Sequence, residues 1–169
     1  MSFSSEVKGE LAEHIDSSRH CQIAELAALF VCNGKIECDK AGKTILAIQS
    51  ENEQVIRKSF TLLQKSFNIC TGVTLKSPYL LEIYGDGDVR KLMQALKLPE
   101  PSAEKLPEYD VVNSLLIKNS CCRRAFLRGA FLAAGSMSDP EKSYHLEFVC
   151  GSEHQAVQLQ EILFDFRIE

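Results

Sequence analysis

The segment Cys121–Met137, CCRRAFLRGAFLAAGSM, contains two cysteines and three arginines and is otherwise mostly apolar or small. Helical spacing puts Ala125, Gly129 and Ala133 at i, i+4 and i+8, on one strip without side-chain bulk. The alanines alone could simply favour helix, but a glycine inside a helix costs about 1 kcal/mol relative to alanine. A very close contact with a partner helix would offset that cost. The segment therefore predicts a helix whose backbone nearly touches its partner.

The partner helix is predicted by a second copy of the same pattern, 101 residues earlier in the chain. At this offset the matched pairs are Cys21 and Cys122, Ala24 and Ala125, Leu26 and Leu127, Phe30 and Phe131, and Gly34 and Gly135. Ala24 and Ala28 supply the matching strip of small residues. Several matched features in the same order indicate a duplicated unit.

Apolar periodicity and turn residues predict the elements of the first copy. The order is helix, two strands, helix, two strands, helix. The predicted ranges are helix 21–34, strands 35–38 and 44–48, helix 53–67, strands 70–76 and 79–84, and a helix around 89–96. Four regions result: an N-terminal helix or arm (1–20), a first repeat (21–98), a proline-rich linker (99–119) and an incomplete second repeat (120–169).

Composition limits the class of protein. The 169 residues are 45% hydrophobic with a formal net charge of −4, typical of a globular domain and unlike a surface that binds phosphates throughout. We expect no membrane span and no signal peptide, because no apolar run approaches the required length. The seven cysteines and four histidines lack metal-site spacing, which predicts unpaired thiols in a reducing cytoplasm, no metal and no cofactor. A vicinal disulfide between Cys121 and Cys122 is the less favoured alternative.

Two motif segments, LAALFVCNG (Leu26–Gly34) and LRGAFLAAG (Leu127–Gly135), each end a small-residue helix in glycine. With the duplicated αββαββα order, they resemble the LAGLIDADG homing endonuclease fold, an α+β fold. The start MSFSSEVKGEL and the segment CCRRAFLRGAFLAAGSMSDPEKSYHLE are more similar still to the WhiA family, bacterial regulators with a degenerate copy of that fold. The resemblance covers the whole chain. It implies an N-terminal fragment without the helix-turn-helix domain of that family, its second repeat truncated.

The resemblance permits a test for nuclease chemistry. In active members the eighth residue of each motif is an acid, and the two carboxylates hold divalent metal ions that activate water. The corresponding residues here are Asn33 and Ala134. Alanine offers no oxygen, and the asparagine amide is a neutral, weak ligand. The nearest other acids are Glu37, Asp39 and Asp139, which we interpret as solvated surface groups. We therefore expect no enzyme activity.

The DNA-binding saddle of the family corresponds to the predicted strands. Across residues 35–50, 69–86 and 136–150 these segments carry five lysines against seven acids. Because lysine and arginine give phosphate binding its strength, such a saddle should bind DNA weakly. The candidate DNA contacts are Lys35, Lys40, Lys43 and Lys76.

A basic cluster lies near the start of the second motif helix. It comprises Lys118, Arg123, Arg124 and Arg128. The family geometry implies that this end points away from the saddle, and cations at a helix N-terminus oppose its dipole. We expect ion pairs with Glu6, Glu10 or Glu108, and a partner-binding surface is the alternative.

The WhiA resemblance implies a non-catalytic domain of a DNA-binding transcriptional regulator linked to sporulation, cell division and chromosome segregation. The domain would act as a scaffold or protein-interaction module in the cytoplasm, at the nucleoid, with a sigma factor or co-regulator as partner. Direct DNA binding through the saddle is the alternative, and an active nuclease is the least favoured. An unpaired strand edge near YHLEFV (Tyr144–Val149) also predicts self-association.

Overall fold

The computed structural model describes residues 2–99 and 110–168. A short helix, α1 (Phe3–Glu13), precedes the first repeat. That repeat contains α2 (Arg19–Asn33), β1 (Gly34–Cys38), β2 (Thr44–Ser50), α3 (Glu53–Phe67), β3 (Gly72–Thr74), β4 (Tyr79–Ile83) and α4 (Asp86–Ala95). The predicted order is confirmed, and α3 matches its predicted bounds.

The second repeat begins after a 3-10 helix, η1 (Ser114–Ile117), which lies within the predicted linker 99–119. It contains α5 (Ser120–Ala134), β5 (Gly135–Met137), β6 (Leu146–Phe148) and α6 (Glu153–Asp165). This order repeats the first four elements of the first unit. Part of the predicted linker, residues 100–109, lies outside the described residues.

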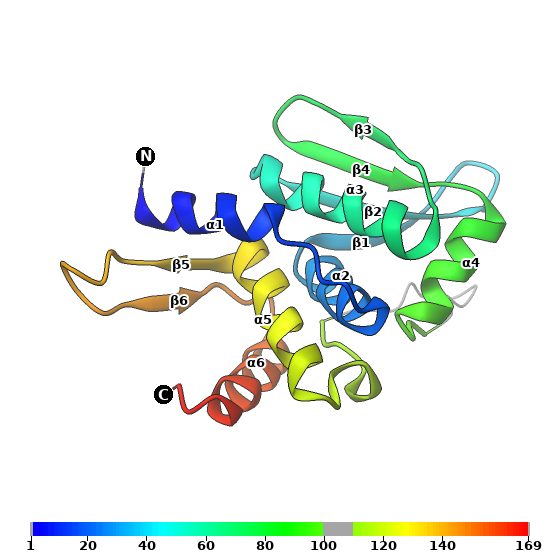
Figure 1. Cartoon of the computed structure of the whole chain (residues 1–169). Coiled ribbons are helices and arrows are strands. Elements are labelled where there is room, and N and C mark those ends of the chain that lie inside the picture. The colour runs from blue at the N-terminus through cyan, green and yellow to red at the C-terminus, as the bar shows by residue number, and fades with distance from the viewer. Residues whose placement is uncertain (1, 100–109, 169) are drawn as a thin grey trace.

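The first repeat forms a four-stranded antiparallel sheet in the order β1-β2-β4-β3. Alternation along the strands sends one set of side chains to a buried face, where α2 and α3 cover the sheet (Figure 1). The buried strand residues on this face are Ile36, Leu46, Ile48, Leu81 and Ile83, and Ala47 on the opposite face is buried as well. The opposite face is the saddle face. β5 and β6 make a separate two-stranded sheet.

Helix α2 is the centre of the molecule. All its residues from Cys21 to Val31 are buried except Ile23, which is half-buried. It packs against α5 on one side and against α3 and the first sheet on others (Figure 1). A helix that is apolar on nearly all sides has to be enclosed in this way, so α2 joins the two repeats into one core.

Candidate functional site

Helices α2 and α5 touch along the strip of small residues. Ala24 and Ala125 are fully buried at the contact. A Cβ added at Gly129 would stand 2.6 Å from the backbone oxygen of Glu25 and 3.0 Å from the Cβ of Ala28. The first distance is shorter than any real Cβ contact, so this position requires glycine for the packing and not only for helix propensity. Ala133, one turn further on, is half-buried.

The two helices run parallel, because their N-terminal residues Cys21 and Cys122 share a buried cluster. Their C-terminal ends therefore lie at the same end of the pair. Asn33 is the last residue of α2 and Ala134 the last of α5. At both positions a glycine follows and starts a strand, and its N–H donates to the carbonyl four residues earlier.

No carboxylate extends from these helix ends. The Oδ1 atom of Asn33 is buried and has no hydrogen-bond partner among the described residues. The neighbouring acids have local roles. Glu37 pairs with Lys35, Asp39 accepts the N–H groups of its own turn, and Asp139 accepts the N–H of Glu141. The described residues thus provide no carboxylate pair for two metal ions at this end.

The saddle face carries few free cations. One row across the sheet reads Lys35, Ala47, Glu82 and Gly72. The Nζ atom of Lys35 lies 3.0 Å from Glu37 and donates to Gln49 at 3.2 Å. A hydrogen bond to Glu82 raises the pKa of Tyr84 above its ordinary value. Acids and neutral groups therefore surround the single lysine of this row.

The other candidate lysines lie in two turns at opposite ends of the sheet. Lys40 and Lys43 belong to the β1–β2 turn, and Lys76 to the β3–β4 turn. Strand β2 starts beside the end of β4 and ends beside its start, which separates the two turns by the length of the sheet. The four lysines thus do not form one continuous patch.

The arginines of the predicted basic cluster each contact different groups. The Arg128 side chain is only 11% exposed and donates to Asp16 at 2.8 Å and to Glu25 at 3.0 Å. Arg123 donates to the carbonyls of Ile117 and Lys118. Arg124 lies over the ring of Phe166. The predicted partners Glu6 and Glu10 are wrong, because Arg128 pairs with acids of the α1–α2 connection and of α2, and Arg123 pairs with Asp165 of α6 at 3.5 Å. Glu108 lies outside the described residues.

A buried ion pair that the sequence did not predict lies behind the helix contact. Glu25 and Lys58 are both 0% exposed, with 3.0 Å between Oε1 and Nζ. Lys58 also donates to the carbonyls of Leu11 and His14. Burial raises the pKa of Glu25 and lowers that of Lys58, and the opposite charges counteract both shifts. The one acid in the apolar run CQIAELAALF was the available signal.

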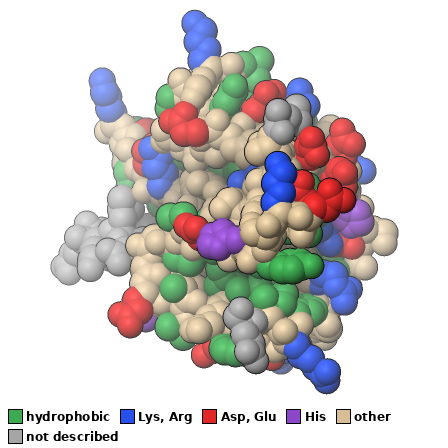
Figure 2. Space-filling model, turned by 90° about the vertical axis from the view of Figure 1, so that its left-hand side faces the viewer, with side chains coloured by type: hydrophobic (Ala, Val, Ile, Leu, Met, Phe, Trp, Pro, Cys, Tyr) green, Lys and Arg blue, Asp and Glu red, His purple; other side chains and the backbone are tan. Residues whose placement is uncertain are grey.

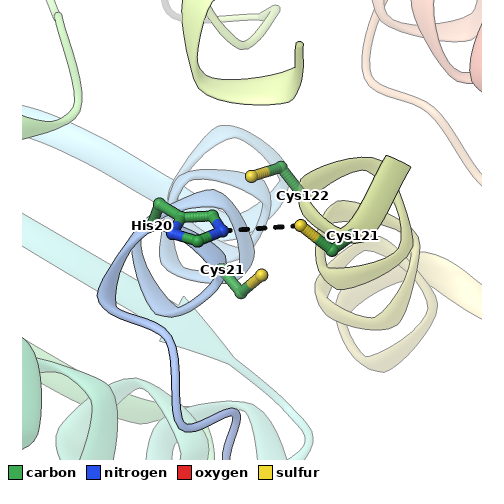
Figure 3. A group of neighbouring side chains, drawn as sticks. All are labelled: His20, Cys21, Cys121 and Cys122. Atoms are coloured by element: carbon green, nitrogen blue, oxygen red, sulfur yellow. Dashed lines mark hydrogen bonds between the residues drawn. The ribbon is translucent and has the colours of Figure 1, made fainter. Parts of the chain in front are cut away.

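At the other end of the helix pair, four ligand-type side chains meet: His20, Cys21, Cys121 and Cys122 (Figure 3). Their ligand atoms all lie within 4.8 Å of one another. A contact with His20 lowers the pKa of the exposed Cys121, and burial raises that of Cys21 to about 12. All seven cysteines are free thiols, so no vicinal disulfide forms. Spacing along one segment could not find this set, because each half comes from a different repeat. The 101-residue offset was the usable signal.

Two family models match the chain. The WhiA N-terminal LAGLIDADG-like domain covers residues 19–98, and the WhiA LAGLIDADG-like domain covers residues 123–169. The chain belongs to the WhiA family. The probable cell division protein WhiA of Lachnoclostridium phytofermentans is 44% identical over 178 residues, covering 100% of this chain and 56% of the relative. The corresponding protein of Lachnospira eligens is 38% identical, and the match covers 100% of this chain and 55% of the relative. The chain thus spans about half the length of these WhiA relatives.

Solved structures confirm the α+β LAGLIDADG-like fold of this WhiA chain. The N-terminal LAGLIDADG domain of DUF199/WhiA matches with a TM-score of 0.67 at 21% identity, covering 98% of this chain and 75% of that one. Full-length DUF199/WhiA from Thermotoga maritima matches with a TM-score of 0.64 at 23% identity, and the match covers 99% of this chain and 51% of that one. I-DmoI in complex with its target DNA matches with a TM-score of 0.57 at 14% identity, and the match covers 87% of this chain and 77% of that one. Among the described helices, none combines the length and apolar character needed to cross a bilayer.

Proposed function

We propose that this chain is a non-catalytic LAGLIDADG-like domain of a DNA-binding regulator of cell division, in which it acts as a scaffold. The observation that carries the proposal is the pair of helix ends at Asn33 and Ala134. They occupy the motif positions where the nuclease fold needs two acids, and neither residue supplies a negative oxygen. Without carboxylates there is nothing to hold the metal ions that activate water and stabilise the leaving oxygen.

A scaffold role is favoured over direct DNA binding by the character of two surfaces. The row of the saddle face that contains Lys35 also contains Glu82, and Lys35 is already paired with Glu37. A protein gains affinity for DNA mainly when its cations displace counterions from phosphates. A face with paired and widely separated lysines offers little of that gain.

The second surface is apolar and suits contact with protein. Figure 2 shows hydrophobic side chains gathered in a hollow on the face that carries α1, the β5–β6 hairpin and α6. A groove of about 600 Å³ lies between these elements, with Phe131, Leu146 and Leu163 among its lining residues. Exposed apolar clusters of this kind are typical of protein–protein contact sites and not of phosphate recognition.

The finer role follows from the proposed scaffold function and from the family resemblance. We place the chain in the cytoplasm at the nucleoid, beside a helix-turn-helix DNA reader, in a transcriptional regulator linked to cell division, sporulation and chromosome segregation. The protein partner is a sigma factor or a co-regulator. The names of the WhiA relatives support the cell-division part of this proposal.

A DNA titration tests the proposal against direct binding by the saddle. Fluorescence anisotropy with a labelled duplex is recorded over a series of salt concentrations, for the chain and for a Lys40→Ala/Lys43→Ala/Lys76→Ala variant. We expect weak binding that the triple variant barely changes. Tight binding with a steep salt dependence, lost in the variant, would establish the saddle as a DNA site. In parallel, the chain is incubated with supercoiled plasmid and Mg²⁺ or Mn²⁺, and cleavage of the plasmid is measured. Cleavage would contradict a non-catalytic domain.

A further inference from the structure

The side-chain cluster at the N-terminal end of the α2–α5 pair is separate from the vestigial acid positions, which lie at the opposite helix ends. We propose that His20, Cys21, Cys121 and Cys122 form a tetrahedral Cys3His site for a soft divalent metal ion of the zinc class. The ion would join the two repeats where their motif helices begin. Three thiolates and one imidazole are a common ligand set of structural zinc sites.

The distances suit such a site. His20 Nε2 and Cys121 Sγ are 3.4 Å apart, and no pair of ligand atoms in the group is separated by more than 4.8 Å. Zinc bonds of about 2.3 Å to sulfur and about 2.0 Å to nitrogen place tetrahedral ligands roughly 3.5–3.8 Å apart. The widest pair therefore needs to close by about 1 Å, within reach of a side-chain rotation. Cys121 and His20 are exposed, so they are free to make that adjustment.

The duplication explains why four ligands converge. Helix α2 contributes His20 and Cys21, and α5 contributes Cys121 and Cys122, which are equivalent positions under the 101-residue offset. Cys21 and Cys122 are buried in the helix contact, next to Ala24 and Ala125. The set therefore has two buried sulfur ligands, Cys21 and Cys122, and two exposed ligands, His20 and Cys121. The outer side provides the entry path for an ion.

Electrostatics at this end of the helices favour the loaded site. Both helices begin immediately before the ligand pairs, after the N-caps Ser18 and Asn119. Burial raises the pKa of Cys21 and of Cys122, and the partial positive charge at a helix N-terminus counteracts this effect because it favours thiolates. A divalent ion with three thiolates and one neutral imidazole has a net charge of −1, which two helix N-termini stabilise. Binding releases up to three thiol protons to solvent and changes no oxidation state.

Metal titration of the purified, reduced, metal-free chain tests the site. Co²⁺ serves as the spectroscopic probe and Zn²⁺ as the competitor, under exclusion of oxygen. The variants are His20→Asn and Cys121→Ser, because both residues are exposed and their replacement should not disturb the core. The control is Cys38→Ser, which removes an exposed thiol outside the cluster.

We expect one ion per chain, thiolate-to-cobalt charge-transfer absorption with the intense d–d bands of tetrahedral cobalt, and displacement by zinc. Each cluster variant should bind more than about tenfold more weakly, and the control should match the wild type. Zinc should raise the Tm of the wild type and of the control more than that of the two variants. The proposal would be overturned by an octahedral cobalt spectrum or by an unchanged metal affinity of the Cys121→Ser variant. It would also be overturned if Cys21 and Cys122 formed a disulfide and the chain took up no metal after that disulfide was reduced.

Discussion

Gly129 of α5 lies so close to Glu25 of α2 that a Cβ at position 129 would stand 2.6 Å from the Glu25 carbonyl oxygen. This contact joins the first motif helix to the second. It occurs midway along both helices, between the His/Cys cluster at one end and Asn33 and Ala134 at the other. The spacing of the two repeats depends on it.

Gly129→Ala should destabilise the chain although alanine is the better helix former. Overpacking costs typically about 1–3 kcal/mol, and here the added methyl meets backbone that has no rotamer to change. The matched control is Gly9→Ala in α1, where an added Cβ meets nothing within 4 Å. The control should be neutral or stabilising by up to about 1 kcal/mol. Urea unfolding monitored by circular dichroism measures both, and an equal effect of the two substitutions would contradict the close contact.

Glu25→Gln should reduce the free energy of unfolding by about 3–5 kcal/mol, because Lys58 would keep a buried charge without its anion. Replacing both partners, as Glu25→Leu with Lys58→Met, should recover much of the loss. The control is Glu53→Gln, which breaks the exposed Glu53–Arg57 pair and should cost under about 0.5 kcal/mol. Chemical denaturation gives all three values. A small effect of Glu25→Gln would show that the pair is not buried as described.

Thiol alkylation should distinguish Cys32 from the exposed cysteines. Burial raises the pKa of the Cys32 thiol to about 12, so almost none of it is thiolate at pH 8. Because the thiolate is the nucleophile, iodoacetamide at pH 8 should label the exposed Cys38, Cys70 and Cys121 first and Cys32 far more slowly. The Cys32 rate should still rise about tenfold per pH unit between pH 8 and 10, since that window lies below its pKa. Peptide mass spectrometry measures the extent of alkylation at each cysteine. Early labelling of the half-buried Cys32 would contradict the raised pKa of its thiol.

The chain should self-associate through the free edge of β6. Strand β2, its counterpart in the first repeat, is paired on both sides, whereas β6 pairs with β5 alone among the described strands. An unpaired edge beside exposed apolar side chains invites pairing with a second copy. Val149 is 71% exposed next to this strand, so Val149→Lys should weaken association by adding charge at the edge. Light scattering over a concentration series tests this, and a strictly monomeric wild type would contradict it.

The sequence was most informative where contacts are local. Apolar periodicity predicted α3 to the residue and the order of all seven elements of the first repeat. Gly129 signalled a close contact because only packing explains a glycine there. The start of α4 was less accurate: the predicted helix began around residue 89, but α4 already begins at Asp86, after Gly85 with its positive φ of 91°.

Contacts between distant segments were beyond the sequence pattern. Glu25 and Lys58 look like ordinary surface charges until the fold encloses both. Arg128 was assigned acids in α1, but the chain between α1 and α2 brings Asp16 nearer. The His/Cys cluster depends on two helices meeting at equivalent residues, a relation that spacing within either segment does not contain.

The obstacle at position 129 is a main-chain oxygen, and this limits the evolutionary routes open to the duplicated chain. A steric clash with a side chain can be relieved by a smaller residue on the opposite helix, but every amino acid at position 25 keeps the same carbonyl group. No compensating exchange in the first repeat can therefore admit a bulkier residue into the second. The two copies are free to differ in charge and chemistry, as they do at Asn33 and Ala134, only while this one site stays fixed.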